Sequence, residues 1–247
     1  MSITSEEELR ELKEVGRIVG RALKEIAAEV KPGVTTGQLD ELAAKILKRN
    51  GARSAPILVY GFPGSICISL NDEIVHGIPG PRVIRAGDLV KLDLTAEKGG
   101  FMADAAVTVP VPPVSDDARR LAKCAERAFR KAIGVARARR PLSDIGRAVE
   151  DEVHRSGFSV VRELCGHGIG RTIHEAPTVP NFYDPLIVGR LTEGLVITIE
   201  PLIAAGSGDE FLAKDGWTVK TRDRSLAAHF EHTLVITRDE PILLTAA

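Results

Sequence analysis

The chain has 247 residues, enough for one large domain or two small ones with a sizeable buried core. Its 33 lysines and arginines nearly balance its 34 aspartates and glutamates, which excludes a bulk electrostatic attraction to nucleic acid or to an anionic membrane. Hydrophobic residues make up 44% and charged residues 27%, proportions typical of a globular protein and not of a disordered one.

The cysteines and the N-terminal sequence both indicate an intracellular protein. The three cysteines, Cys67, Cys124 and Cys165, include no Cys-x-x-Cys pair, so neither a disulfide framework nor a thiolate zinc site is expected. The first ten residues are acidic where a secretory or organellar leader would be basic, which predicts a cytoplasmic location. Prolines and glycines interrupt the longest uncharged stretch, residues 54–71, so we expect strands and turns there and no membrane-spanning helix.

The first half of the chain begins with two predicted helices. Apolar residues recur at intervals of three and four over residues 6–30, which predicts an amphipathic helix that Ser5 and Glu8 cap. A second helix is expected over residues 35–50, and Gly51 ends it. Short β-strands, separated by glycine and proline, are then predicted over residues 65–70, 88–95 and 103–109.

The second half of the chain is predicted to repeat this order. Residues 108–115 form a proline-rich connector between the halves, and Arg140 with Pro141 marks a later break between two helices. The predicted elements are a helix over residues 116–138, a second helix that Ser143 caps and Gly157 ends, and a strand over residues 194–200.

Corresponding features of the two halves are separated by nearly the same number of residues. Gly157 follows the second helix pair as Gly51 follows the first, and the strand at 194–200 resembles that at 87–93, each ending on a carboxylate. We interpret this as a single domain, 1–247, of two similar helix–helix–sheet halves, approximately 1–110 and 111–247, folded face to face. The alternative is that local patterns repeat by chance in an α/β chain of this length.

Four acidic residues lie within apolar sequence: Asp93, Asp104, Glu200 and Glu231. Burial of one unpaired carboxylate costs several kcal/mol, so each residue alone is expected to be exposed, paired or bound to a cation. Four carboxylates that the repeat brings together would repel one another, and two divalent cations would relieve that repulsion. The pattern therefore favours a dinuclear metal site over four separate exposed acids.

Three histidines lie in glycine-rich or apolar surroundings: His76, His167 and His174. A lone histidine is more often structural than a ligand, but the glycines around His167 leave room for a metal or a substrate. The run at 166–170 does not have the glycine spacing of a dinucleotide-binding loop. One histidine with four carboxylates suits paired Mn(II), Fe(II), Co(II) or Zn(II), which activate water for hydrolysis.

Five motifs in this order resemble methionine aminopeptidases of type I, and the resemblance covers nearly the whole chain. It implies the pita-bread fold, an α/β (α+β) fold with two pseudo-twofold-related helix–helix–sheet halves around a central antiparallel sheet. The motifs are Ser69-Leu-Asn-Asp-Glu-Ile-Val-His-Gly-Ile-Pro79, Lys91-Leu-Asp93, Cys165-Gly-His-Gly-Ile-Gly-Arg171, Thr198-Ile-Glu-Pro201, and Asp215-Gly-Trp-Thr-Val-Lys220 leading to Glu231-His-Thr233.

The resemblance implies a role for each candidate metal ligand. Asp93 would bind one metal, Asp104 and Glu231 would bridge the pair, and His167 with Glu200 would complete the other. A hydroxide that bridges the metals would attack the first peptide carbonyl, and Glu200 would transfer protons. The implied cofactors are two divalent ions of Co, Mn, Fe or Zn.

The resemblance also implies the substrate and its contacts. His76 and His174 would lie beside the scissile amide and stabilise the oxyanion. Phe62, Tyr60 and Trp217 are the expected walls of the methionine pocket. The implied reaction removes the N-terminal methionine from nascent proteins and peptides when the second residue is small.

The chain departs from the family pattern at several positions near the site. Type I enzymes often have a cysteine and a tyrosine before the Gly-Phe-Pro-like turn, where gap-free counting puts Pro56 and Val59, whereas a one-residue deletion would place Tyr60 there. Ala105 stands where a hydroxyl residue is common, so one hydrogen bond to a metal ligand is expected to be missing. His229 replaces a usual glutamine.

Several interpretations stay open on the sequence alone. Cys67 is equally consistent with a thiol near the site and with a buried structural thiol. The basic residues 137–140 either form a solvated helix end, which the helix dipole favours, or make a transient ribosome contact. The expected partners are nascent polypeptide N-termini, with no membrane, no specific DNA and a monomeric state. Alternative functions are an aminopeptidase of altered or proline-directed specificity and a non-catalytic pita-bread binding protein.

Overall fold

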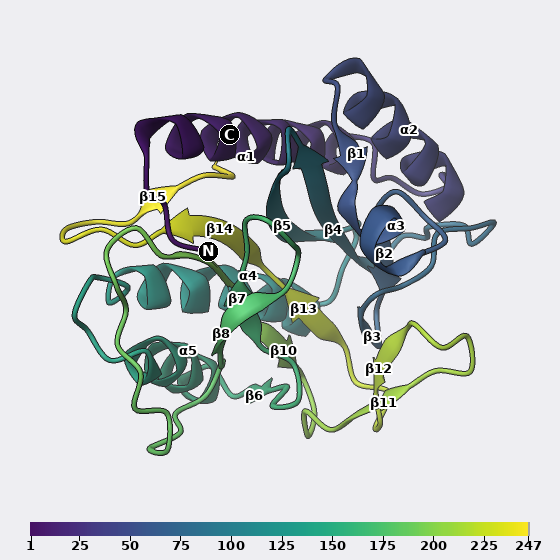
Figure 1. Ribbon diagram of the computed structural model, residues 1–247. Helices are drawn as coiled ribbons and strands as arrows, with labels where there is room; N and C mark the ends of the chain where they lie inside the picture. The colour runs from purple at the N-terminus through teal and green to yellow at the C-terminus, as the bar shows by residue number, and fades with distance from the viewer. Residues whose placement is uncertain (247) are drawn as a thin grey trace.

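The computed structural model describes residues 1–246 and contains helices and strands in the two predicted series (Figure 1). Ser5 and Thr35 accept hydrogen bonds from the first turns of the two N-terminal helices, which explains why both helices begin where predicted. The helices are α1 (Glu6–Ala28), α2 (Thr36–Arg49), α3 (Ala55–Tyr60), α4 (Asp116–Ile133) and α5 (Ser143–Arg155).

The structure corrects the sequence prediction at three helices. Residues 54–71 were expected to hold only strands and turns, but α3 forms there, because a proline is tolerated in a first helical turn and the left-handed Gly61 ends the helix. The helix predicted over 116–138 ends at Ile133, with Gly134 at its C-cap position. Ser143 is the first residue of α5 and not its cap, a position that Leu142 occupies without a side-chain hydrogen bond.

The strands form one large antiparallel sheet and two small ones of three strands each. The central path of the large sheet runs β1-β4-β5-β14-β9-β7-β8, with β2 also paired to β4 and β15 to β14. The strands are β1 (Arg53–Ser54), β2 (Cys67–Leu70), β3 (Glu73–Val75), β4 (Leu89–Lys98), β5 (Phe101–Pro110), β6 (Ser159–Val160), β7 (Gly166–Gly168), β8 (Glu175–Val179), β9 (Val196–Ile199), β10 (Leu202–Ala204), β11 (Glu210–Leu212), β12 (Val219–Thr221), β13 (Ala227–His229), β14 (Glu231–Val235) and β15 (Ile242–Leu243).

The centre of the large sheet joins segments that are far apart in the sequence. Strands β4 and β5 form a hairpin of ten residues on each side, longer than the predicted strands at 88–95 and 103–109. Strand β14 lies between β5 and β9, and places Glu231 opposite Ala106 and His232 opposite Ile199. Residues from both halves of the chain therefore meet on four consecutive strands.

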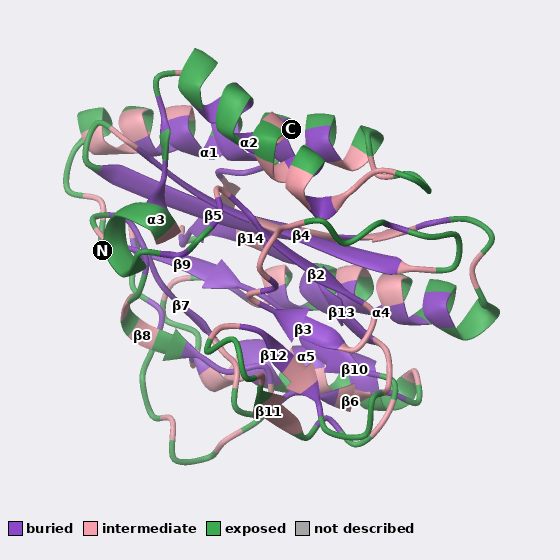
Figure 2. Ribbon diagram, turned by 90° about the vertical axis from the view of Figure 1, so that its right-hand side faces the viewer, coloured by how far each residue is buried: buried purple, intermediate pink, exposed green. Residues whose placement is uncertain are grey.

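Two large hydrophobic clusters lie on the two helix pairs. Helices α1 and α2 pack with β4 and β5 around buried residues such as Leu12 and Leu92, whereas α4 and α5 pack with β9 and β14 around residues such as Phe129 and Ile197. Paired Ala105 and His232 contact the α1/α2 cluster and Phe129 of α4, respectively, so the two helix pairs pack on the same face of the large sheet, at its two ends (Figure 1). Figure 2 shows that the strands of this sheet are mostly buried. The boundary between two halves near residue 110 stays a prediction.

Among residues 1–246, none of the helices combines the length and apolar composition that a membrane crossing requires.

Candidate metal centre

The five predicted metal ligands lie on or directly after five neighbouring strands of the large sheet and face one cavity of about 150 Å³. They come from strands β4, β5, β14 and β7 and from the residue that follows β9, so the order of the strands, and not the order of the sequence, brings them together. In sheet order the ligands are Asp93, Asp104, Glu231, Glu200 and His167.

The potential ligand atoms form two overlapping groups that share Glu231. In one group Asp104, His167 and Glu231 offer atoms that lie within 4.8 Å of one another, and in the other Glu200, His229 and Glu231 do so. The Nε2 atom of His167 also lies 3.5 Å from Oε1 of Glu200. This spacing suits cation coordination, because ligands about 2.1 Å from one ion in a tetrahedron lie about 3.4 Å apart.

Burial makes the four carboxylates difficult to ionise without a cation. It raises the pKa of Asp93, Glu200 and Glu231 well above the usual values, and the neighbouring Asp104 charge raises all three further. Burial also raises the pKa of Asp104 itself. Within residues 1–246, none of the ion pairs joins a lysine or arginine to any of the four, and Asp104 Oδ1 and Glu231 Oε1 are buried without a hydrogen-bond partner. Such a set of oxygen and nitrogen donors fits a pair of divalent cations.

Two threonines orient these ligands. The Thr95 hydroxyl donates a 2.8 Å hydrogen bond to Asp104 Oδ2, so the Asp104 carboxylate keeps a hydroxyl partner although Ala105 has none. The Thr198 hydroxyl donates to Glu200 Oε1 at 2.8 Å and accepts from the His167 backbone N–H at 3.0 Å. One side chain thus fixes ligands on two adjacent strands.

A third threonine fixes the backbone of Asp104. The Thr233 hydroxyl accepts from the Asp104 N–H at 2.8 Å and donates to the Asp104 carbonyl at 2.7 Å. The sequence interpretation missed all three threonines. The sequence spacing could have identified them. Each threonine lies two residues along a strand from an acidic ligand, and that spacing puts both side chains on one face of the sheet. Thr95 follows Asp93, Thr198 precedes Glu200, and Thr233 follows Glu231 in this way.

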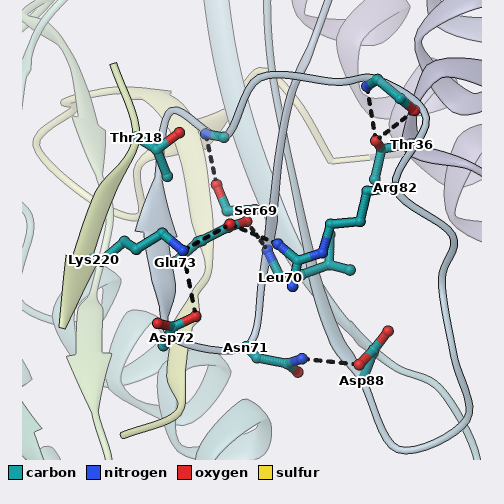
Figure 3. A network of polar contacts seen from close by, with 12 residues as sticks. Thr36, Ser69, Leu70, Asn71, Asp72, Glu73, Arg82, Asp88, Thr218 and Lys220 are labelled. Atoms are coloured by element: carbon teal, nitrogen blue, oxygen red, sulfur yellow. Dashed lines mark hydrogen bonds and ion pairs between the residues drawn. The ribbon is translucent and has the colours of Figure 1, made fainter. Parts of the chain in front are cut away.

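A network of polar contacts fixes the loop that carries His76 (Figure 3). Buried Glu73 accepts from the Leu70 N–H at 2.8 Å and pairs with Arg82 at 2.6 Å and Lys220 at 3.2 Å. The Ser69 hydroxyl accepts from the backbone N–H of the residue after His76 at 2.9 Å. Much of the long acidic motif at 69–79 is therefore structural, and it supports the loop instead of contributing ligands.

His76 itself has a left-handed backbone, with φ of 58°, and its side chain lines the cavity. A left-handed conformation is uncommon for a residue other than glycine and is concentrated at functional sites. Burial, with a smaller contribution from the nearby His174, lowers the pKa of His76 to about 4. His76 is therefore neutral at physiological pH and has an N–H group to donate.

His174 also lines the cavity, and its ring centre lies 4.3 Å from that of His167. Burial lowers its pKa, followed by the effect of His167. The Tyr60 hydroxyl lies 2.6 Å from the His174 Nδ1 atom, which leaves Nε2 as the nitrogen without this contact. Tyr60 therefore lines the cavity and also contacts His174, the histidine predicted to stabilise the oxyanion.

The apolar wall of the cavity contains the aromatic pair that the sequence predicted. Phe62 and Trp217 meet edge to face with ring centres 5.2 Å apart. Of the two residues placed at pocket positions by gap-free counting, Pro56 lines the cavity, whereas the half-exposed Val59 is not part of the lining. Cys67 is both buried and part of the lining, and burial, followed by the charge of Asp93, raises the pKa of its thiol well above the usual value.

The basic residues 137–140 lie beyond the end of α4, so the interpretation as a helix end is wrong. The structural reason is the early termination of the helix at Ile133. Arg140 instead forms an ion pair of 2.6 Å with Asp144 in the first turn of α5. Contact of this segment with a ribosome stays a prediction.

The sequence is similar to known metallopeptidases over its whole length. The model of "Metallopeptidase family M24" matches residues 10–238. Methionine aminopeptidase 2 of Bacillus subtilis (strain 168) is 44% identical over 247 residues, which cover 99% of both chains.

Solved structures agree with the sequence comparison. The crystal structure of methionine aminopeptidase from Rickettsia prowazekii has a TM-score of 0.95 at 38% identity, and covers 99% of this chain and 100% of that one. That from Thermotoga maritima has a TM-score of 0.97 at 33% identity, with full coverage of both chains. These likenesses confirm the predicted pita-bread fold. The sequence match and the arrangement of the buried ligands lead to one conclusion: the chain belongs to metallopeptidase family M24.

Proposed function

We propose that the chain is a metal-dependent methionyl aminopeptidase, which hydrolyses the first peptide bond of proteins and peptides that begin with methionine. The observation that supports this most strongly is the convergence of four buried carboxylates and a histidine from five adjacent strands on one partly apolar cavity. Similarity to methionine aminopeptidases over 99% of the chain supports the same function.

The proposed ligand roles follow the order of the strands. Asp93 would hold one divalent ion, Asp104 and Glu231 would contribute to both, and His167 with Glu200 would complete the second. When bound, such a pair polarises a peptide carbonyl and lowers the pKa of water from about 15.7 to about 7. The donor set is consistent with Co(II), Mn(II), Fe(II) or Zn(II) as the cofactors.

The chain's own side chains supply the proton transfers. Glu200 is the proposed proton carrier, since its carboxylate lines the cavity beside the other proposed ligands. It accepts a proton from water on the attacking side and delivers it to the nitrogen of the leaving amine. Thr198, which donates to Glu200 Oε1, keeps one oxygen oriented while the other exchanges the proton.

His76 and His174 are the proposed donors to the substrate carbonyl oxygen. Both are neutral because burial lowers their pKa values, and both line the cavity. If the Tyr60 hydroxyl donates to Nδ1 of His174, the proton of the ring stays on Nε2, where it can stabilise the developing oxyanion. Tyr60 thus acts on the substrate through His174.

The apolar wall is the proposed methionine pocket. Phe62 and Trp217 form an edge-to-face pair beside Pro56 and Cys67, and an unbranched thioether side chain packs well against aromatic rings. The preference for a small second residue in the substrate is part of the proposal and follows from the similarity to methionine aminopeptidases.

The biological setting is part of the proposal. The substrates are nascent polypeptide N-termini in the cytoplasm, and the chain acts as a monomer in which residues 1–247 form one catalytic domain. Ribosome contact would be transient and would involve the basic residues 137–140.

The decisive experiment is a peptide panel. The purified chain is freed of metal, reloaded separately with Mn(II), Co(II), Fe(II) or Zn(II), and mixed with peptides that vary in their first and second residues. We expect release of methionine from Met-Ala and Met-Ser peptides, little release when the second residue is large, and no release in the presence of a chelator. Preferential cleavage before proline, or of other first residues, would instead identify an aminopeptidase of different specificity. No cleavage with any metal would support a binding protein.

A further inference from the structure

His229 is a buried residue of the cavity for which the proposed mechanism has no use. It is the last residue of β13, its side chain is 1% exposed, and it contributes to the cavity lining. Neither of its ring nitrogens has a hydrogen-bond partner. A buried polar group without a partner costs about 1–3 kcal/mol, so such a ring in a native protein requires an explanation.

The backbone of His229 is fixed on two sides, so the position of the ring is determined by the fold. The Thr108 hydroxyl accepts from the His229 N–H at 2.9 Å and donates to the His229 carbonyl at 2.8 Å. On the other side, His229 pairs with Leu202 of β10. The imidazole is therefore presented to the cavity by two strands and a threonine.

The free Nε2 atom faces the carboxylates of two proposed ligands. It lies 3.5 Å from Glu231 Oε2 and 3.9 Å from Glu200 Oε2. These separations are longer than the roughly 2.7–2.9 Å of a charge-assisted hydrogen bond between an imidazolium and a carboxylate. They are close to the spacing of about 3.4 Å between atoms that share one tetrahedrally coordinated ion.

We propose that His229 is a metal ligand, and that its Nε2 atom binds a cation that Glu200 and Glu231 also hold. The inference rests on the proposed function, since it adds a sixth protein ligand to that centre. Glu200 would then lie between two histidines, with His167 3.5 Å from Oε1 and His229 3.9 Å from Oε2. A second neutral nitrogen donor favours Fe(II), Co(II) or Zn(II) over Mn(II) at this position.

The inference is tested on the Co(II)-loaded full-length chain by proton NMR. A histidine bound to Co(II) through one nitrogen has its remaining ring N–H shifted far outside the normal range, and that signal disappears in deuterated water. We expect His229→Gln to lack one such signal that the wild type has, and to bind Co(II) at least about tenfold more weakly in calorimetry. His154→Gln, which alters an exposed histidine of α5, should keep the wild-type spectrum and affinity.

A second measurement does not depend on the variant. In a crystal of the wild-type chain with Co(II), the anomalous signal locates the ions, and Nε2 of His229 should lie about 2.1 Å from one of them. An ion bound by the other ligands with His229 more than 3 Å away, or identical spectra and affinities for wild type and His229→Gln, would overturn this inference and leave the proposed function intact. A chain that binds no Co(II) would overturn both.

Discussion

Substitution of Thr233 by valine tests how the fold supports a metal ligand. Valine has nearly the same shape as threonine but lacks the hydroxyl, which bonds both the N–H and the carbonyl of Asp104 at 2.8 and 2.7 Å. Thr233 is fully buried, so water cannot replace either bond. Each unsatisfied buried backbone group costs about 1–3 kcal/mol, and we expect the free energy of unfolding to fall by about 2–4 kcal/mol.

Thr233→Ser is the matched control, because it keeps the hydroxyl and removes one methyl group. It should lower the free energy of unfolding by only about 1 kcal/mol. Urea denaturation of the metal-free proteins, followed by circular dichroism, gives both values. The valine variant should also bind metal more weakly, because the Asp104 backbone is no longer fixed. If Thr233→Val is no less stable than Thr233→Ser, the two hydrogen bonds do not hold Asp104 as described.

Three further predictions concern single side chains. Asp104→Asn should reduce methionine release, measured by mass spectrometry, by at least 100-fold and reduce bound metal, because a shared charge is lost; near-normal turnover would contradict its role. Tyr60→Phe should lower kcat about tenfold with little change in KM, and should have no effect in a chain that already carries His174→Gln. The Ser225 side chain and two backbone N–H groups lower the pKa of exposed Asp223 to about 2, so Asp223→Asn should lower the melting temperature at pH 6 and much less at pH 2, where most of this contribution is lost in the wild type.

Local sequence patterns predicted the helices and the acidic strands. The apolar spacing in α1 and its Ser5 cap are local properties, and both occur in the structure. The short helix α3 was missed because six residues are too few to show a helical period, and the proline in its first turn suggested a turn. The early end of α4 at Ile133 carries no such local signal, since Gly134 at the C-cap keeps right-handed helical backbone angles.

The supporting residues of the site could not be predicted in the same way, because their function depends on which strands are neighbours. The bond from Thr233 to Asp104 requires that β14 pairs with β5, across 129 residues of sequence. His229 was noted only as a departure from a family pattern, since its approach to Glu200 exists only when β13 and the end of β9 are close in space. The candidate ligands were predictable because buried acids are rare; their partners were not, because threonines on strands are common.

Glu231 belongs to both ligand groups, so in the proposed two-ion centre the two cations would not bind independently. An ion at one position would orient the shared carboxylate and cancel part of the negative charge, and both effects would change the affinity at the other position. Because such coupling is reciprocal, the binding isotherm for two ions contains a cooperativity term of the same size in either order of filling. A protein half-loaded with metal is then a distinct thermodynamic species, whose abundance depends on the supply of metal in the cell.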